Sequence, residues 1–358
     1  MSDLLPILKR HIRAQGPLSL ADYMSLCLTH PEHGYYTNRT AIGAKGDFIT
    51  APEISQMFGE MLGLSLAHYW MEMGAPSAFT LAELGPGRGT LMADILRATR
   101  AVPGFHQAMT LALVELSPKL RDEQARALDD YDPIWVNDLA SLGAHHSNPL
   151  LLVANEFFDA LPIRQFIRSD KGWTERVVGL GANGDLQLGL SPETRLERLE
   201  PHFKSTQPGD IVQMQFASGH IDAIGRWIAQ SGGCALVIDY GDWQIREDTF
   251  QAVRAHAYTG PLESPGHADL TTHVDFSDLS ANVPDGCFAA PLASQGDYLN
   301  ALGIAHRAQA LAAGSDRHGA EKIAHDLRRL TDPAEMGSLF KVFGLYKEGH
   351  PLPPGFGP

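Results

Sequence analysis

Residues 79–89 of this chain read Phe-Thr-Leu-Ala-Glu-Leu-Gly-Pro-Gly-Arg-Gly, and this stretch decides the fold. Its first part, Phe79–Leu84, is an apolar run that predicts a buried β-strand. Three glycines follow, and apolar residues at roughly helical spacing then indicate a helix that begins near Thr90. Glycine lets the backbone come close to a ligand because it has no Cβ to collide with it. A strand, a glycine turn and a helix in this order predict a nucleotide-cofactor site.

The spacing of the glycines separates two kinds of cofactor. A dinucleotide fingerprint has the pattern G-x-G-x-x-G. Here Gly85, Gly87 and Gly89 give G-x-G-x-G, and Thr90 stands where the third dinucleotide glycine would fall. Glu83 precedes the first glycine by two residues, so the whole reads E-x-G-x-G-x-G. This pattern resembles motif I of the class I S-adenosylmethionine (SAM) methyltransferases, although a structural tight turn also produces glycine-rich turns.

Two further predicted strands end beside acids. The apolar run Met109–Glu115 predicts a second strand, and a carboxylate at its end can accept two hydrogen bonds from a ribose diol. A helix cap is the alternative role for Glu115. A short strand is predicted at Ile134–Val136, and we expect Asp138, followed by Leu139, to lie beside the adenine amino group.

A fourth apolar strand, Leu150–Ala154, opens onto Asn155, Glu156 and Asp159. Ligands of open α/β sheets bind outside the carboxyl ends of the strands, so these side chains should project toward the transferable methyl group. Two carboxylates are costly to bury unless they meet a cation or share protons. An arginine guanidinium fits two carboxylates through paired hydrogen bonds. The alternative is a capped turn with solvated acids.

The same segment lacks the Asn/Asp-Pro-Pro-aromatic signature of methyltransferases that act on amide or adenine nitrogens. This departure disfavours glutamine and nucleobase acceptors.

A polar loop precedes the first strand of the fold. Asp47 and Thr50 lie in it, just ahead of Pro52 and of a helical apolar pattern that continues toward Trp70. We predict that this loop covers the cofactor. An ordinary helix N-cap with a solvated acid explains the two residues equally well.

The substrate side of the site is predicted from the second half of the chain. The strongly apolar run Cys234–Asp239 predicts a fifth strand, with Asp239 and Tyr240 at its end. A polar and aromatic region follows, from which His273 and Asp275 are expected to face the acceptor. His273 has the chemistry of a general base, and a satisfied loop histidine is the alternative. No cluster has metal-ligand spacing, so no metal is predicted.

Composition narrows the class of protein. The chain has 358 residues, 44% of them hydrophobic, which suits one large domain or one domain with a substantial insert. A net charge of −14 leaves no basic surplus for nucleic acid. No apolar run reaches the ~18 residues of a membrane span. The first 20 residues lack a signal-peptide pattern, so we expect a bacterial cytoplasmic protein.

The chain is predicted to be organised in five parts. They are an N-terminal helical segment with the covering loop (1–78), the first half of the cofactor-binding core (79–162), a β-hairpin insertion (163–216), the second half of the core with a substrate-side insertion (217–350) and a tail (351–358).

Seven segments together resemble one family, the MidA-like SAM-dependent methyltransferases. The segments are GDFITAPEISQMFGE (46–60), ELGPGRGTL (83–91), VELSPKL (114–120), ANEFFDALP (154–162), IDYG (238–241), ADLTTHVDF (268–276) and MGSLFKV (336–342). The resemblance implies an α/β fold with the seven-stranded Rossmann-like sheet of class I methyltransferases. It also implies SAM as the methyl donor and an arginine of a respiratory complex I subunit as the acceptor.

Two rival functions stay open from the sequence. One is a SAM-binding assembly chaperone with little turnover, and the other is a nicotinamide-dependent oxidoreductase on a related sheet. The glycine spacing disfavours the second. A protein partner is expected for the methyltransferase and for the chaperone, and a homodimer is one open arrangement.

The glycine turn generates a direct test. Gly87→Val should weaken SAM binding about tenfold or more, because the side chain fills space that the cofactor needs. Isothermal titration calorimetry measures the affinity, and wild-type affinity in the variant would contradict the assignment.

Overall fold

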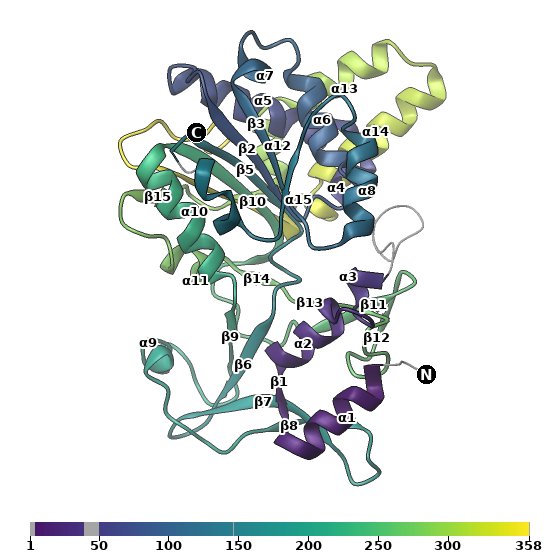
Figure 1. The fold of residues 1–358 in the computed structure, drawn as a ribbon, viewed down its shortest axis with the longest axis vertical. Coiled ribbons are helices and arrows are strands. Elements are labelled where there is room, and N and C mark those ends of the chain that lie inside the picture. Colours follow the sequence, from purple (N-terminus) through teal and green to yellow (C-terminus); the bar gives the residue numbers. More distant parts are fainter. Residues whose placement is uncertain (1–3, 39–49, 146, 358) are drawn as a thin grey trace.

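The computed structural model describes residues 4–38, 50–145 and 147–357 (Figure 1). The chain forms two lobes, one built on a large mixed sheet and the other on two smaller sheets with the N-terminal helices. The predicted site residues lie where the two lobes meet, because the strands of the large sheet point their carboxyl ends toward the smaller lobe.

The large sheet has the strand order β15-β17-β10-β5-β2-β3-β4. The five strands β10, β5, β2, β3 and β4 run parallel to one another, and β17 is antiparallel to both of its neighbours in this order. This is the sheet of class I methyltransferases, as predicted. The strands are β2 (Phe79–Leu84), β3 (Met109–Val114), β4 (Ile134–Val136), β5 (Leu150–Asn155), β10 (Gly233–Asp242), β15 (Cys287–Ala289) and β17 (Phe340–Lys347).

Helices cover both faces of this sheet, which explains why every residue of β2 and of β5 is buried. One face packs against α5 (Gln56–Glu72), α6 (Thr90–Thr99), α7 (Phe105–Ala108), α12 (Gln295–Ala301) and α13 (Ile304–Ala313). The other packs against η1 (Leu139–His145), α10 (Ser218–Ser231) and α11 (Phe276–Ala281). Helix α8 (Pro118–Ala127) follows β3 and lies beside the glycine turn.

Short strands extend the large sheet at its substrate side. Strand β14 (Val274–Asp275) pairs in parallel with the end of β10, and β16 (Ala293–Ser294) pairs with β17. The pairing with β14 carries the 268–276 segment to the tips of the central strands.

The second lobe is assembled from three separate parts of the chain. Its larger sheet has the order β1-β7-β6-β9, with β8 beside β7, and its smaller sheet the order β12-β11-β13. The strands are β1 (Leu18–Ser19), β6 (Ile163–Arg168), β7 (Trp173–Leu180), β8 (Leu186–Leu190), β9 (Ile211–Gln215), β11 (Gln251–Arg254), β12 (Ala257–Thr259) and β13 (Asp269–Thr271). The helical elements are α1 (Leu4–Gln15), α2 (Leu20–Thr29), α3 (Tyr35–Asn38), η2 (Glu197–Leu199) and α9 (Glu200–Phe203).

This assembly differs from the linear division drawn from the sequence. The hairpins predicted as a separate insertion at 163–216 take their edge strand β1 from the N-terminal segment. They also share a hydrophobic core with α1, α2 and the 250–270 region. Such a pairing cannot be predicted from the local sequence, because nothing in the residues of β1 indicates which distant strand they pair with.

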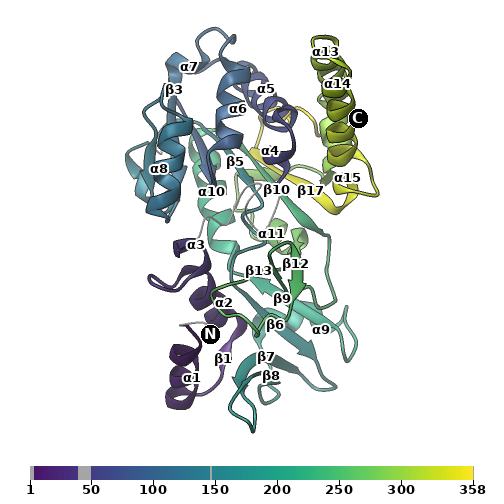
Figure 2. The same ribbon diagram turned by 90° about the vertical axis from the view of Figure 1, so that its right-hand side faces the viewer.

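Several helices precede the last strand of the large sheet. Gly303, with φ of +87°, separates α12 from α13. Helix α14 (Arg317–Thr331) then pairs with α13 in a hairpin at one edge of the sheet, and α15 (Met336–Leu339) leads into β17 (Figure 2). The structure has no described helix long and apolar enough to cross a membrane.

Glu60 joins this helical hairpin to the core. The Glu60 carboxylate is only 3% exposed and accepts hydrogen bonds from Arg307 of α13 (2.7 and 3.0 Å) and from Arg97 of α6 (2.9 Å). Burial by itself would raise the pKa of Glu60, but the two guanidinium groups hold it below its usual value. Three helices distant in sequence therefore meet at one carboxylate.

Glu60→Gln should lower the free energy of unfolding by about 1–2 kcal/mol, because one charged partner is lost while both arginines stay partly solvated. Urea denaturation measures the change. Asp130→Asn is the control, since its ion pair with Arg100 is exposed and should contribute nothing measurable. Equal stability of Glu60→Gln and wild type would contradict the bridging role.

Candidate active site

The glycine turn has the backbone conformation that glycine permits. Gly85, Gly87 and Gly89 have φ of +60°, +53° and +84°. A Cβ on Gly85 would lie 2.8 Å from Cδ2 of Phe157, which shows how closely this backbone packs against the end of β5. The turn therefore presents bare backbone at the carboxyl edge of the sheet.

Two glutamates stand at the ends of β2 and β3. Glu83 is 2% exposed and its Oε2 has no hydrogen-bond partner among the described residues. Burial, and then the nearby Glu115, raise the pKa of Glu83 to about 8. Glu115 accepts hydrogen bonds from Ser117 N (2.7 Å) and Gln124 Nε2 (3.3 Å), and burial raises its pKa as well. The pKa values of both neighbouring acids are raised. A cation or hydroxyl donors placed between the two carboxyl groups would stabilise their ionised forms.

Gln124 connects this acidic edge to the glycine turn. Its Nε2 also donates to the carbonyl of Gly87 (2.7 Å), and its Oε1 accepts from the indole of Trp135 (2.8 Å). Asp138 is exposed and accepts from Ser141 at the start of η1, while Leu139 is buried in the core beneath it. Both hydrogen bonds from Ser141 reach Oδ1 of Asp138. They do not test the expected contact with the adenine amino group, which stays a prediction.

From Thr50 onward, the segment predicted to cover the cofactor contacts residues of the candidate site, and the covering role itself stays a prediction. Its short helix α4 (Ala51–Ile54) begins after Thr50, whose side chain makes no cap hydrogen bond. The amide of Ala51 donates to Glu156 Oε1 (3.2 Å), and Thr90 donates to Glu53 Oε1 (2.7 Å). Helix α4 thus bridges the glycine turn and the end of β5. Asp47 lies outside the described residues.

The three polar residues predicted at the tip of β5 lie close together, and their projection toward the methyl group stays a prediction. Asn155 Nδ2 donates to Glu156 Oε1 (3.2 Å), and Asn155 Oδ1 is buried without a partner in the described structure. Glu156 has φ of +50°, a left-handed conformation that costs a residue with a Cβ about 1 kcal/mol. Such strain concentrates at functional sites. The Glu156 amide donates to Ile238 O (2.9 Å), which fixes the strained residue against β10.

Glu156, which is half-buried, and the buried Asp159 interact as a pair of acids. Burial and then Asp159 raise the pKa of Glu156 to about 8. Burial also raises the pKa of Asp159, to about 6, against an opposing hydrogen bond from Tyr240. Among the described residues neither carboxylate forms a salt bridge with a lysine or arginine. With no cation of the described chain beside the pair, Glu156 is mostly protonated near neutral pH.

Asp239 has a different place from the one predicted. It is fully buried, and its Oδ2 accepts from the amides of Phe158 (2.9 Å) and Asp159 (3.1 Å). Its Oδ1 accepts from the amide of Tyr240 (3.0 Å). With both oxygens used by backbone amides, Asp239 does not face an acceptor and instead holds the turn that carries Asp159.

Asp275 is likewise a structural residue and not a substrate-side one. It is the N-cap of α11 and accepts from the amides of Ser277 (3.0 Å), Gln244 (3.1 Å) and Ile245 (3.2 Å). These hydrogen bonds tie the start of α11 to the loop after β10. The sequence pattern of an acid beside a histidine gave no sign of this.

Tyr240 and His273 lie together on the substrate side. Their rings meet edge to face at 5.3 Å, and the Tyr240 hydroxyl hydrogen-bonds with Asp159 and with Thr271. Burial lowers the pKa of His273. This favours a neutral imidazole, and a role in proton transfer stays a prediction.

Sequence reasoning missed one contributor to this edge. Tyr36 of α3 donates from its hydroxyl to Asp269 Oδ1 (2.8 Å). The His-Gly-Tyr-Tyr turn at 33–36 was the available signal, since paired tyrosines beside a glycine turn are an unusual choice for a solvated loop.

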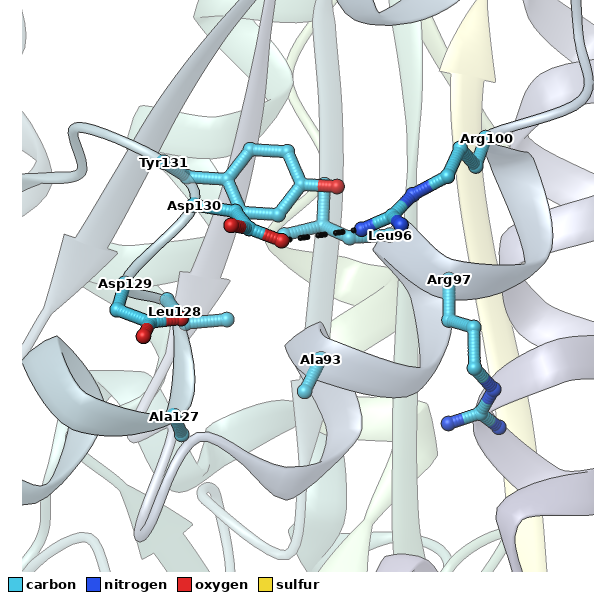
Figure 3. Close-up of a pocket in the computed structure, with 9 residues that line it drawn as sticks. All are labelled: Ala93, Leu96, Arg97, Arg100, Ala127, Leu128, Asp129, Asp130 and Tyr131. Atoms are coloured by element: carbon cyan, nitrogen blue, oxygen red, sulfur yellow. Dashed lines mark hydrogen bonds and ion pairs between the residues drawn. The ribbon is translucent and has the colours of Figure 1, made fainter.

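Two hollows lie elsewhere on the large lobe. Figure 3 shows one of about 90 Å³ between the carboxyl ends of α6 and α8, where Arg100 pairs with Asp130. It is far from the strand tips, because both helices begin at that edge and run away from it. The other, of about 450 Å³, lies between α4, α6 and α14. Its acids Glu53, Asp94 and Asp326 each have a basic neighbour.

The sheet order, the glycine turn and the acids at the strand tips define a class I SAM-dependent methyltransferase. Comparison with known proteins agrees. A family model described as "Putative S-adenosyl-L-methionine-dependent methyltransferase" matches residues 61–289. The chain belongs to this family, as its resemblance to the MidA-like methyltransferases implied, and the nicotinamide alternative falls.

Three relatives show how far the similarity extends. Protein arginine methyltransferase NDUFAF7, mitochondrial, of Danio rerio is 36% identical, over 96% of this chain and 86% of that protein. Its Homo sapiens counterpart is 34% identical, over 96% and 83%. A crystal structure from Burkholderia thailandensis with S-adenosyl-homocysteine bound has a TM-score of 0.83 at 26% identity, and covers 99% of this chain and 94% of that one.

The cofactor of this enzyme is SAM, and the residues at the strand tips fit it. The unpartnered Glu83 Oε2 and the paired Glu115 offer acceptors for the ammonium group and the ribose hydroxyls. The glycine turn leaves room for close backbone approach. Together these residues would hold the cofactor so that its reactive end faces Glu156 and Asp159.

SAM or S-adenosyl-homocysteine should release up to about one proton on binding at pH 7, because a cation beside Glu83 lowers a pKa that starts near 8. Calorimetry in buffers of different ionisation enthalpy counts the proton. Glu83→Gln should abolish most of the release and weaken binding about tenfold. Equal proton release by the variant and wild type would contradict the role of Glu83.

Proposed function

We propose that this enzyme transfers the methyl group of SAM to an arginine side chain of a protein partner. The observation that carries the proposal is the acid pair, Glu156 and Asp159, at the tip of β5 beside the cofactor turn. The proposal extends to a subunit of respiratory complex I as the acceptor and to the bacterial cytoplasm as the place. A homodimer stays a prediction that light scattering on the purified protein tests.

A guanidinium group matches what the acid pair lacks. It is a planar cation with five N–H donors, and it binds two carboxylates through parallel hydrogen bonds. Entry of such a cation would lower the raised pKa values of both acids and favour their ionised forms. A neutral hydroxyl or amide acceptor would leave the two acids uncompensated. The names of the relatives, protein arginine methyltransferases, support the same acceptor.

When bound, SAM supplies a sulfonium methyl that passes to the attacking nitrogen in one displacement, with the electron pair of the broken bond left on sulfur. The chain contributes position: Glu156 and Asp159 orient the guanidinium and draw its charge away from the attacking nitrogen. Holding two reactants in line accounts for most of the acceleration that such a site can give. Burial favours the protonated form of Glu156, so this carboxylate accepts the proton that the nitrogen loses as the methyl group is transferred.

A SAM-binding assembly chaperone is the rival function, since the same cradle would serve it. Turnover separates the two. Purified protein incubated with methyl-labelled SAM and a cell lysate should label a discrete protein band, and peptide mass spectrometry should place the label on arginine. A lysate that stays unlabelled would favour the chaperone, and label on another residue type would overturn the arginine assignment.

Glu156→Gln should keep SAM affinity within about twofold and lower the rate of methyl transfer by about 100-fold or more, because the amide neither carries charge nor accepts the proton. Calorimetry measures the first quantity and label incorporation the second. The matched control is Glu175→Gln, which removes a carboxylate from an ion pair with Arg164 in the second lobe. Undiminished turnover in Glu156→Gln would reject the mechanism.

A further inference from the structure

Tyr36 brings the N-terminal segment into contact with the acids at the tips of the strands. Its hydroxyl lies 2.8 Å from Asp269 Oδ1 and donates to it. Burial, then Asp269 and then Asp159, raise the pKa of Tyr36 well above the ordinary phenol value. The phenol therefore lies beside two carboxylates, one from β13 and one from the turn after β5.

Two phenol–carboxylate pairs lie next to each other here. Tyr240 of β10 hydrogen-bonds with Asp159, and Tyr36 of α3 hydrogen-bonds with Asp269. Asp159 and Asp269 are each 6% exposed. The backbone joins the two pairs, since the amide of Thr272, three residues after Asp269, donates to the carbonyl of Asp159 (3.0 Å).

The position of Tyr36 is fixed by packing at several points. Tyr35 is fully buried beside it, and their rings meet edge to face at 5.2 Å. Upstream, the Tyr23 hydroxyl donates to Pro261 O (2.7 Å). At Gly266, with φ of +75°, a Cβ would lie 2.3 Å from the carbonyl of His33. The N-terminal helices and the 250–272 region are therefore held in close contact, and α3 cannot shift without disturbing both.

A structural role alone does not account for this placement. The Tyr23 hydroxyl shows the structural solution, a phenol that satisfies one backbone carbonyl. The Tyr36 hydroxyl instead donates a hydrogen bond to a buried carboxylate that lies next to a second one, where such a donor orients the anion and favours its charged form.

Resting on the proposed function, we propose that Tyr36 is a positioning residue of the acceptor site. Its hydroxyl fixes Asp269 beside Asp159, so that the N-terminal segment completes the acidic wall that receives a cationic side chain. Tyr240 does the same for Asp159 from the other lobe, and the acceptor site is thus a product of both lobes.

Several titratable groups face this wall and set its pH dependence. They are Glu156 and Asp159 after β5, Asp239 and Tyr240 on β10, Asp269 on β13, and Tyr35 and Tyr36 on α3. Because burial raises the pKa values of Glu156 to about 8 and of Asp159 to about 6, transfer efficiency in wild type should rise with pH over this interval.

The test compares Tyr36→Phe with Tyr23→Phe, which removes a phenol from the same lobe but away from the acids. Methyl transfer to the acceptor found in the lysate is measured as kcat/KM between pH 6 and 9. Tyr36→Phe should lower kcat/KM about tenfold. It should also move the acid limb of the pH profile to higher pH, because the Asp269 carboxylate loses the hydrogen bond from Tyr36 that favours its charged form. Both variants should bind SAM as wild type does.

A second arm does not depend on turnover. The full-length enzyme, saturated with S-adenosyl-homocysteine, is titrated with a short peptide that contains one arginine. Wild type and Tyr23→Phe should bind it equally, and Tyr36→Phe should bind it about fivefold or more weakly. Thermal unfolding of each variant shows whether the fold is retained.

The outcomes are distinct. If Tyr36→Phe matches Tyr23→Phe in both arms, or loses activity without a shift of the acid limb, the positioning role is overturned. If wild type binds the peptide but transfers no methyl, the proposed function fails and the binding arm alone decides on Tyr36. If wild type methylates a residue other than arginine, the transfer arm decides.

Discussion

The rest of this structure depends on one electrostatic constraint: carboxylates gathered at the tips of parallel strands without a cation of the described chain to neutralise them. Glu83 and Glu115 form one such group, and Glu156 with Asp159 forms another. Burial raises the pKa values of such acids, and the same effect lowers the stability of the protein without ligand. A cationic ligand would offset this cost, which is the basis for proposing a positively charged acceptor beside the SAM sulfonium.

The fold holds these acids by using other polar groups as scaffold. Asp239 accepts hydrogen bonds from backbone amides around Asp159, and Asp275 accepts them from amides of the loop after β10. Glu156 keeps a left-handed backbone through its bond to Ile238. Only the acids that these scaffolds position keep capacity for a ligand. The contrast explains why neighbouring acids of similar appearance in the sequence have opposite roles.

The two lobes are mutually dependent at the site. From the N-terminal region, α4 reaches Glu156 through the amide of Ala51, and α3 reaches Asp269 through Tyr36. From the large sheet, β10 supplies Tyr240 to Asp159. The donor and acceptor sites therefore share backbone elements. Helix α4 connects the residue after the glycine turn, through Glu53, with the acid pair, through the amide of Ala51.

The sequence by itself determined the core of this protein. The run 79–89 specified strand, turn and helix, since buried strands are uniformly apolar and only glycine adopts the required positive φ without strain. It also placed Glu83, Glu115, Asn155, Glu156 and Asp159 at strand ends, because strand ends of a parallel sheet meet at one edge. The tertiary structure alone decided which acids are scaffold, that β1 joins the hairpins 160 residues away, and that Tyr36 meets Asp269. Those contacts join residues far apart in the chain, and no local pattern encodes a distant partner.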